Sequence, residues 1–444
     1  MIKRIVYIIC LIGFFSNANA QTSYGNEWIK YDGGTYYKFK VGKTSLYRIN
    51  YATLTSLGIP VNQLKGLDFK LFRNGREVPL YVTTSGQFSN NDFIEFYGEK
   101  NDGKPDSILY KNPSEQPNQI QSLFSDTATF FLRLDPFSIN ARVIQQSNDL
   151  SFTPAIERYC YNSVYQYFNI NNPVYSYNRG YAVSPFLPQL YNSDFDLGEG
   201  NIITNFSNRV YGFLQLVPKF LYKDPAVNAY FSTALVHAAG NHVIKTVVNG
   251  FDTTEICVGP IVKRYNYVIN SQNLNESTSG PNGITMSDLV TTSTDNSNLV
   301  AYGILQYPSL LNFDNKTKFN FAFKKKDDLY FEIKNFNNAS TQPILYDLKN
   351  RQRYLGITDT VLKFHMTETA ADKDQLYLSS QSAADIPSIT TITPVNFTNY
   401  LSASQQGNYL IISNKKLRSS TNGLDYINEY KKYSCLILDK LCKK

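Results

Sequence analysis

The chain has 444 residues, of which 42% are hydrophobic, 14% aromatic and 18% charged. This length predicts two or three globular domains rather than one. The net charge of +7 is unevenly distributed: the first twenty residues contain two basic side chains, and residues 406–444 contain eight basic against three acidic ones. The rest of the chain carries no net charge. We expect no nucleic-acid partner, because such binding needs a concentrated basic surface.

The amino terminus has the features of a secretory signal peptide. Lys3-Arg4 precedes an apolar run from Ile5 to Phe15, which closes with Ala18-Asn19-Ala20. Small residues at these last positions suit signal peptidase, so we expect cleavage before Gln21 and a mature protein in the periplasm, on the outer membrane surface or outside the cell. An uncleaved anchor is the alternative. No other stretch has the ~18 apolar residues of a membrane helix, so we expect no membrane span.

Large apolar and polar residues alternate with a period of two through most of the chain, which is typical of half-buried strands. Asn74-Gly75 separates two such segments and supplies the positive φ angles that a tight hairpin requires. The predicted fold class is therefore mainly β, with antiparallel β-sandwich-like domains. The alternating segments are 36–41, 67–73, 77–82, 129–134, 210–217, 242–248, 318–323, 328–334 and 360–366.

Breaks in this pattern suggest where the domains end. The alternation stops at Asp135-Pro136, so the first β domain is expected to end near residue 150. The polar stretch from Asn270 to Asn298 is interpreted as a long surface loop inside the second domain. The predicted divisions are a signal peptide at 1–20, an N-terminal β domain at 21–150, one or more β-sandwich-like domains at 151–405, and a truncated start of an α/β domain at 406–444.

The last forty residues have a different pattern. Residues 409–412 form a continuous apolar run, as in a parallel strand buried on both faces. Residues 423–433 then place apolar side chains at helical spacing. A strand followed by a helix opens an α/β unit, and the chain ends soon after the apolar residues 436–438. We therefore expect this α/β unit to be incomplete.

Four cysteines follow the signal peptide: Cys160, Cys257, Cys435 and Cys442. An exported protein can form disulfides, and four cysteines leave three connectivities open. Their spacing is not that of a zinc site, because the CxxC pattern is missing.

The three histidines are His237, His242 and His365. An extended chain would point His237 and His242 to opposite faces, so we interpret them as ordinary histidines and not as metal ligands.

Residues 101–106 resemble part of a calcium loop. Such a loop needs oxygen ligands at alternate positions, but the preceding alternate positions are Lys100 and Gly98. A turn with a positive φ at Gly103 is the preferred interpretation.

The basic run Lys324-Lys325-Lys326 is followed by two aspartates between strand-like segments, and we predict an exposed hairpin tip there. The sequence also lacks a GxSxG elbow and a glycine-rich phosphate loop. We therefore assign no catalytic, cofactor-binding or metal-ligating residue, and we expect no cofactor.

Several short segments, in order, resemble the amino-terminal region of gingipain-type (caspase-like) cysteine peptidases. This family includes the PorU-like sortases of the Bacteroidota type IX secretion system. The resemblance extends over most of residues 30–430. The segments are Phe93-Ile94-Glu95-Phe96-Tyr97-Gly98, Asp102-Gly103-Lys104-Pro105-Asp106, Leu109-Tyr110, residues 122–132, Leu345-Tyr346-Asp347-Leu348 with Arg353-Tyr354, and Asn408-Tyr409-Leu410-Ile411-Ile412-Ser413.

The resemblance implies a secreted, type IX-associated protein whose family uses a cysteine thiolate and a histidine for peptide hydrolysis. In the family both residues lie well downstream of the strand that residues 408–413 resemble, so the chain is expected to be inactive alone. It would act as a non-catalytic prodomain or scaffold, with a downstream peptidase domain or type IX secretion components as partners. The alternative is a complete extracellular β-sandwich module that binds a glycan or a protein through Tyr-rich loops.

Overall fold

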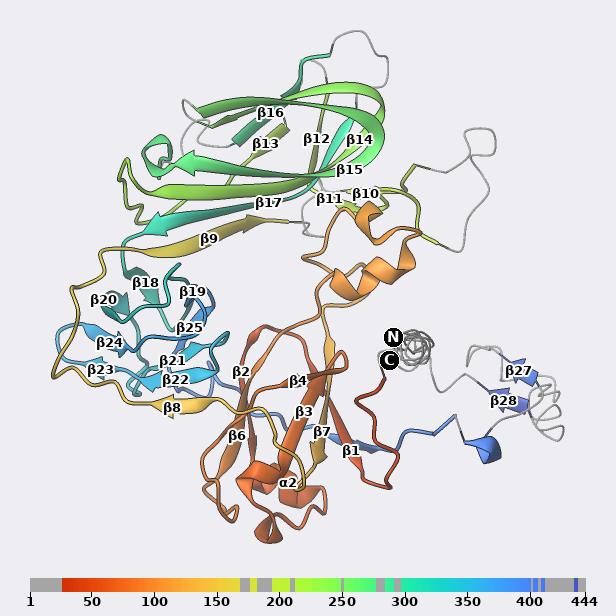
Figure 1. Ribbon diagram of the computed structural model, residues 1–444, viewed down its shortest axis with the longest axis vertical. Coiled ribbons are helices and arrows are strands. Elements are labelled where there is room, and N and C mark those ends of the chain that lie inside the picture. Colours follow the sequence, from red (N-terminus) through yellow and green to blue (C-terminus); the bar gives the residue numbers. More distant parts are fainter. Residues whose placement is uncertain are drawn as a thin grey trace, which may run out of the picture.

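The computed structural model of the protein describes residues 26–167, 176–181, 194–207, 212–248, 251–276, 284–290, 297–400, 402–405, 409–411 and 435–437. The described chain is mainly β, as the alternating pattern predicts. Figure 1 shows three β-rich bodies, coloured orange, green and blue, each formed by strands packed around a core of its own. The signal peptide predicted at 1–20 lies outside the described residues.

The first body is a sandwich of two sheets around a core that includes Phe39, Phe69, Phe96 and Phe130. Short 3₁₀ helices η1 (Val61–Gln63), η2 (Gly66–Asp68), η3 (Lys104–Leu109) and η4 (Pro113–Glu115) lie in its connections. One sheet has the order β26 (Thr393–Val395), β1 (Tyr36–Val41), β7 (Ala128–Leu134), β3 (Phe69–Arg73), β4 (Arg76–Val78). The other has β2 (Ser45–Asn50), β6 (Phe93–Gly98) and β5 (Tyr81–Val82), with helix α2 (Tyr51–Ser56) following β2.

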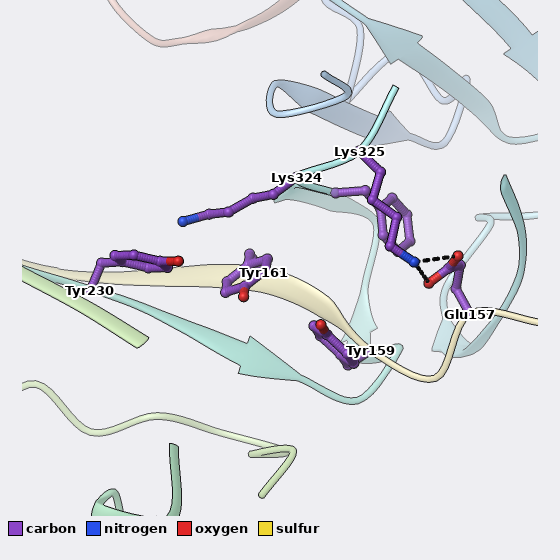
Figure 2. A pocket seen from close by; sticks show the side chains of 7 residues that line it. Glu157, Tyr159, Tyr161, Tyr230, Lys324 and Lys325 are labelled. Carbon is purple, nitrogen blue, oxygen red and sulfur yellow. Dashed lines mark hydrogen bonds and ion pairs between the residues drawn. The ribbon is translucent and has the colours of Figure 1, made fainter. Parts of the chain in front are cut away.

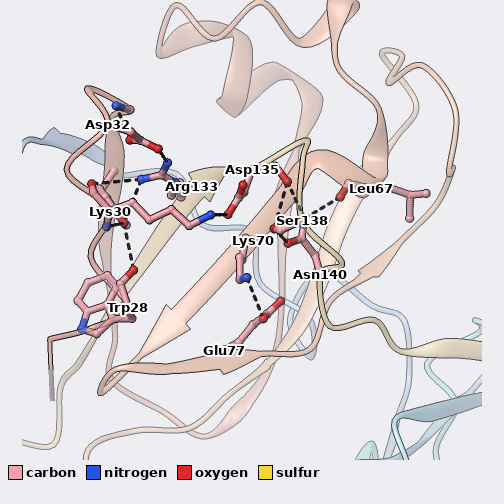
Figure 3. Close-up of polar contacts among 12 residues, drawn as sticks. Trp28, Lys30, Asp32, Leu67, Lys70, Glu77, Arg133, Asp135, Ser138 and Asn140 are labelled. Carbon is pink, nitrogen blue, oxygen red and sulfur yellow. Dashed lines mark hydrogen bonds and ion pairs between the residues drawn. The ribbon is translucent and has the colours of Figure 1, made fainter. Parts of the chain in front are cut away.

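The segment before β1 lies along the outer face of the first sheet (Figure 3). The Trp28 ring packs against four aromatic rings with centroids 5.1–5.5 Å away, those of Tyr36, Phe72, Phe131 and Phe397. Lys30 Nζ donates a hydrogen bond to Asp135 Oδ2 at 2.6 Å, and the Arg133 guanidinium pairs with Asp32. The only tryptophan of the protein therefore covers the face of the sheet that points away from the core.

The second body is built on one long hairpin that folds back on itself. β14 (Asn228–Val248) and β15 (Phe251–Asn270) pair along their length, with a register shift between His237 and Gly240. Glu255 and Lys263 would be roughly 26 Å apart on a straight strand, yet they form an ion pair at 2.8 Å. A Cβ on Gly259 would lie 1.8 Å from the Ala238 carbonyl oxygen, so glycine is required where the hairpin bends.

Because of the bend, the two halves of β14 belong to two layers. Its first half pairs with β17 (Asn298–Ser309) and its second half with β16 (Ile284–Asp288). The core between the layers includes Phe231, Ile244 and Tyr265. The remaining elements here are β9 (Cys160–Gln166), β12 (Thr204–Phe206), β13 (Gly212–Leu214), the separate pair β10 (Ser176–Asn178) and β11 (Gly200–Ile202), and η5 (Ser271–Asn273).

The third body is a second sandwich, with a core rich in phenylalanine; the rings of Phe313 and Phe319 are stacked with centroids 4.0 Å apart. One sheet has the order β18 (Asn312–Lys316), β20 (Leu329–Phe336), β24 (Leu362–Met366), β23 (Ile357–Thr358). The other has the order β19 (Lys318–Phe321), β25 (Leu376–Ser379), β21 (Ile344–Asp347), β22 (Gln352–Leu355), β8 (Ile144–Gln146). A separate apolar cluster that includes Leu46, Tyr346 and Tyr377 joins this second sheet to the first body.

Several local predictions can be compared with these elements. The hairpin at Asn74-Gly75 is confirmed: the two residues have φ angles of 48° and 76° and connect the antiparallel strands β3 and β4. The surface loop predicted for 270–298 is wrong in part, because β16 lies within it and buries Ile284 and Met286. The alternation of apolar and polar residues at 284–288 covers only five positions and lies between polar segments, so the sequence pattern does not reveal this strand.

The hairpin tip predicted at the lysine triplet is also wrong. The triplet is exposed, but β19 and β20 belong to different sheets, so residues 322–328 form a crossover between layers.

The positive φ predicted at Gly103 is wrong as well. The turn at 101–106 leads into η3, but Gly103 has a φ of −80°. Glycine is needed there because a Cβ would lie 2.5 Å from the Gln121 carbonyl oxygen.

After η6 (Ala403–Gln405), the strands β27 (Tyr409–Ile411) and β28 (Cys435–Ile437) form a parallel pair, in which Tyr409 faces Cys435 and Ile411 faces Ile437. The helix predicted at 423–433 lies outside the described residues. Within the part of the chain that the structure describes, no helix has the length and apolarity to cross a membrane.

Candidate functional site

A cleft of about 570 Å³ lies between the second and third bodies and reaches the edge of the first. One wall is formed by β9, through residues 161–165, and the other by β19. Tyr97 and Glu99 of the first body close one side. The lining combines tyrosine rings with amide and charged side chains, a composition suited to binding a polar ligand or a polypeptide.

Both walls of the cleft are edge strands. Among the described strands, β19 is the last strand of its sheet and pairs with β25, and β9 pairs with β17. They meet at one point, where the Tyr161 amide donates to the Ala322 carbonyl at 2.8 Å and the Ala322 amide donates to the Tyr161 carbonyl at 2.9 Å. Beyond this bridge the strands separate, and the cleft opens between them. The cleft is therefore a wedge between two strand edges.

A smaller pocket of about 190 Å³ adjoins the closed end of the wedge (Figure 2). Lys324 reaches across it and places its Nζ 3.2 Å from the ring centroid of Tyr230 and 4.5 Å from that of Tyr161. Tyr159 also lines the pocket, and Lys325 pairs with Glu157 at 2.8 Å. Desolvation in this setting lowers the pKa of Lys324 to about 8, while the ring faces favour its charged form.

Lys373 holds the crossover that contains the lysine triplet, through hydrogen bonds to its main chain. Its side chain is fully buried, and its Nζ donates to the carbonyl oxygens of Lys326 and Asp327 at 2.7 and 2.8 Å and to the Thr369 hydroxyl at 3.0 Å. Burial lowers the pKa of Lys373. This lysine holds the crossover and is not available to a ligand.

The two histidines of β14 meet, contrary to the prediction that they point to opposite faces. The bulge between them shifts the alternation, and their ring centroids lie 5.1 Å apart. His237 hydrogen-bonds Asn298 Oδ1 at 2.5 Å and the Tyr265 hydroxyl at 2.9 Å. His242 hydrogen-bonds Asp288 Oδ2 at 2.7 Å.

This histidine network is sealed from solvent. Both imidazoles are fully buried, and Asp288 is 2% exposed. Burial lowers the pKa of His237 to about 4, so this ring is neutral at pH 7. Burial acts to raise the pKa of Asp288, but hydrogen bonds, first among them that from His242, lower it overall. The network can stabilise the bend of the hairpin, but a substrate cannot reach it.

The described cysteines are not activated nucleophiles. Within the described residues, Cys160 and Cys257 form no disulfide. Burial raises the pKa of both, and in Cys257 it outweighs the opposing contact with the Tyr265 hydroxyl at 3.8 Å. Cys442 and the side chain of Cys435 lie outside what the structure describes. Among the described residues, no group of three His, Cys, Asp or Glu side chains is placed to hold a metal ion.

Two of the segments that carry the family resemblance contact each other through buried polar side chains. Glu95 of β6 is fully buried and accepts hydrogen bonds from Arg48 Nε at 2.7 Å and from the Tyr346 hydroxyl. Arg353 Nη2 lies 3.5 Å from Glu95 Oε1, the same oxygen that accepts from Tyr346. The segments 93–98 and 345–354 therefore join in one ion cluster between the first and third bodies.

A second such contact involves the segment 102–106. The carboxylate of Asp106, which is 7% exposed, accepts a hydrogen bond from the Leu123 amide at 2.9 Å. Asn101 Nδ2 donates to the Ser125 carbonyl at 3.0 Å. These acidic and amide groups thus bind the loop at 122–127, and the arrangement is that of a packed turn.

These sheets and contacts define a mainly β protein made of several sandwich-like bodies. No family model matches the chain, and no curated protein matches it. Among solved structures, dimeric latent PorU from Porphyromonas gingivalis is similar at 12% identity and a TM-score of 0.49, over 91% of this chain and 37% of that chain. The PRD1 vertex protein P5 is similar at 10% identity and a TM-score of 0.16, over 24% of this chain and 64% of that chain. This chain thus spans little more than a third of the length of that PorU chain.

Sequence reasoning singled out Lys324 but not its partners, and it did not find the cleft. The two walls come from segments about 150 residues apart, and their contact depends on how the bodies pack. The density of tyrosines at 159–167 is a local signal that could have drawn attention to β9.

Proposed function

We propose that this chain is the non-catalytic, β-rich scaffold portion of a secreted gingipain-like cysteine peptidase, of the PorU-like kind associated with type IX secretion. The main support is that the segments resembling this family are used for structural contacts, around Glu95 and around Asp106. Residues that hold one body against another are what a scaffold or prodomain needs. The protonated state of the Cys160 and Cys257 thiols agrees with a portion that does not perform the chemistry.

The parallel pair of β27 and β28 adds to this proposal. Parallel strands need a crossover connection of a dozen or more residues, usually a helix, and residues 412–434 are long enough to supply one. In the proposal these strands begin the α/β peptidase domain, which partners with the β-rich portion. Export through the predicted signal peptide is part of the same proposal.

Activity measurements test the proposal. The purified chain should not hydrolyse Arg- or Lys-containing peptides, with or without a thiol reductant. A variant with Cys160, Cys257, Cys435 and Cys442 all replaced by serine should behave in the same way. Thiol-dependent hydrolysis that disappears in Cys257→Ser would show that the chain is catalytic, and the scaffold proposal would then fail.

The cleft between β9 and β19 favours a second candidate function, that of an extracellular module that binds a glycan or a protein. The two functions are compatible, because a scaffold can also hold a ligand. The kind of ligand that the cleft fits can be inferred from its backbone geometry.

A further inference from the structure

The open edges of β9 and β19 direct main-chain N–H and C=O groups into the same space. In an antiparallel strand, successive residues direct their N–H and C=O groups alternately to the two sides. Tyr161 uses its groups to reach Ala322 across the wedge, so Ser163 and Tyr165 direct theirs to the wedge as well. Likewise, Ala322 faces the wedge, and so do Asn320 and Lys318 on β19.

Hydrogen bonds on the far side of β19 agree with this assignment. The Ser380 amide donates to the Thr317 carbonyl at 2.8 Å, and the Phe323 amide donates to the Lys373 carbonyl at 2.7 Å. Residues 317 and 323 therefore direct these groups away from the wedge, as the alternation requires. The Ser163 amide already donates to Asn162 Oδ1 at 2.7 Å, so an incoming strand has to displace this side chain in order to use that amide.

We propose that the wedge binds an extended polypeptide segment by strand addition, so that the segment pairs with β19 or β9 and continues the sheet. This goes beyond the proposed scaffold function and does not depend on it. Strand addition uses main-chain hydrogen bonds for affinity and alternate side chains for specificity. The lining residues Asn320 and Tyr165 are exposed, so an incoming strand can reach both edges.

The charges of the lining indicate which peptide fits. Its carboxylates already have basic partners: Glu99 pairs with Arg73 and Asp374 with Lys349. The Lys316 ammonium lies over the Phe319 ring at 5.2 Å and forms no direct ion pair with a carboxylate among the described residues. The segment should therefore carry an acidic side chain toward Lys316 and apolar or aromatic side chains toward the tyrosines.

The test uses the intact chain and two synthetic octapeptides of the sequence Thr-Glu-Val-Tyr-Val-Glu-Val-Thr, capped at both ends and labelled with fluorescein. The second peptide carries N-methyl groups on every internal amide, which removes the main-chain donors along both edges and leaves the side chains unchanged. We expect fluorescence anisotropy to show micromolar binding of the first peptide and binding at least about tenfold weaker for the second, the equivalent of about 1.4 kcal/mol.

Two protein variants locate the binding. Asn320→Pro removes a donor on the open edge, where proline is tolerated, and should weaken binding about tenfold; Lys316→Glu should weaken it through repulsion of the acidic side chain. Lys326→Glu, on the exposed crossover outside the cleft, is the matched control and should bind normally. Hydrogen exchange should show new protection at β19 or β9 when the first peptide is bound.

Absence of binding of the first peptide at millimolar concentration would overturn the proposal. Equal binding of the two peptides would also overturn it, because recognition would then not use the main chain. Binding of a neutral oligosaccharide such as maltohexaose in place of the peptides would assign the cleft to a glycan. If Asn320→Pro does not fold, the pair of peptides still decides the question on the unmodified chain. None of these outcomes depends on peptidase activity.

Discussion

The buried pair His237 and His242 shows how single residues support the bend of the long hairpin. Each imidazole accepts or donates hydrogen bonds at both ring nitrogens, with partners on β14, β15 and the neighbouring strands. Buried polar groups are costly unless they are satisfied in this way. The pair therefore stabilises one geometry of the bend.

The free energy of unfolding should fall as the pH is lowered from about 6.5 to about 4. Burial depresses the pKa of His237 from 6.5 to about 4 in the folded state. In this window the unfolded chain binds a proton that the folded chain does not, so acid favours unfolding. The loss should approach about 3 kcal/mol at the acid end, since one pKa unit corresponds to about 1.4 kcal/mol. Urea unfolding at several pH values measures it.

The control for this experiment replaces the titrating ring. His237→Gln should lower stability at pH 7 and flatten the pH dependence between 6.5 and 4. A parent protein whose stability is constant across this window would contradict the burial of a neutral His237.

At this scale the sequence is a partial guide. It identifies which histidines and cysteines exist, but the face to which a side chain points depends on the bulge between His237 and Gly240. That bulge arises from the close approach of Gly259 to Ala238, which involves two strands. Gly103 is a similar case, because its glycine is required by neighbours at 118–121 and not by its own φ angle.

Among the elements, the turn at Asn74-Gly75 is the one that the sequence predicts best. Asn74 and Gly75 are the two residue types that accept positive φ at low cost, and both positions need it. Strand β16 is the opposite case, because its five residues pair with β13 and β14, which lie elsewhere in the chain. Local chemistry fixes the turn, whereas tertiary pairing fixes the strand.

Gly75→Ala should destabilise the protein by about 1 kcal/mol, because alanine is strained at a φ of 76°. Gly42→Ala is the matched control, since Gly42 has no positive φ and its nearest neighbour to an added Cβ is 3.8 Å away. Thermal unfolding of the two variants gives the comparison. Equal melting temperatures would indicate that the turn adopts another conformation.

For the whole molecule, the ion cluster at Glu95 is the main polar connection between the first and third bodies. Glu95→Gln removes the charge that faces Arg48 and Arg353, and losing one partner of a buried cluster costs about 3–5 kcal/mol. Glu99→Gln is the control, because Glu99 forms a partly exposed pair with Arg73 at 3.4 Å that should contribute less than about 1 kcal/mol. Urea unfolding should therefore separate the two variants clearly; similar small losses would show that the charge of Glu95 contributes little to the contact between the bodies.

The arrangement of the bodies also explains why the cleft was not predictable. The period-two pattern gives strands, but it does not say which strands lie at the edges of their sheets. β9 and β19 become facing edges only when the second and third bodies pack together through Tyr161 and Ala322.

The position of β26 has a consequence for the order in which the protein can form. β26 (Thr393–Val395) pairs with β1 at the edge of the first sheet, although β1 is made at the beginning of the chain. A ribosome must therefore add more than three hundred residues after β1 before this sheet can be completed. Contacts so distant in sequence slow folding, so a newly made chain should keep the edge of β1 open until residues 393–395 have been synthesised.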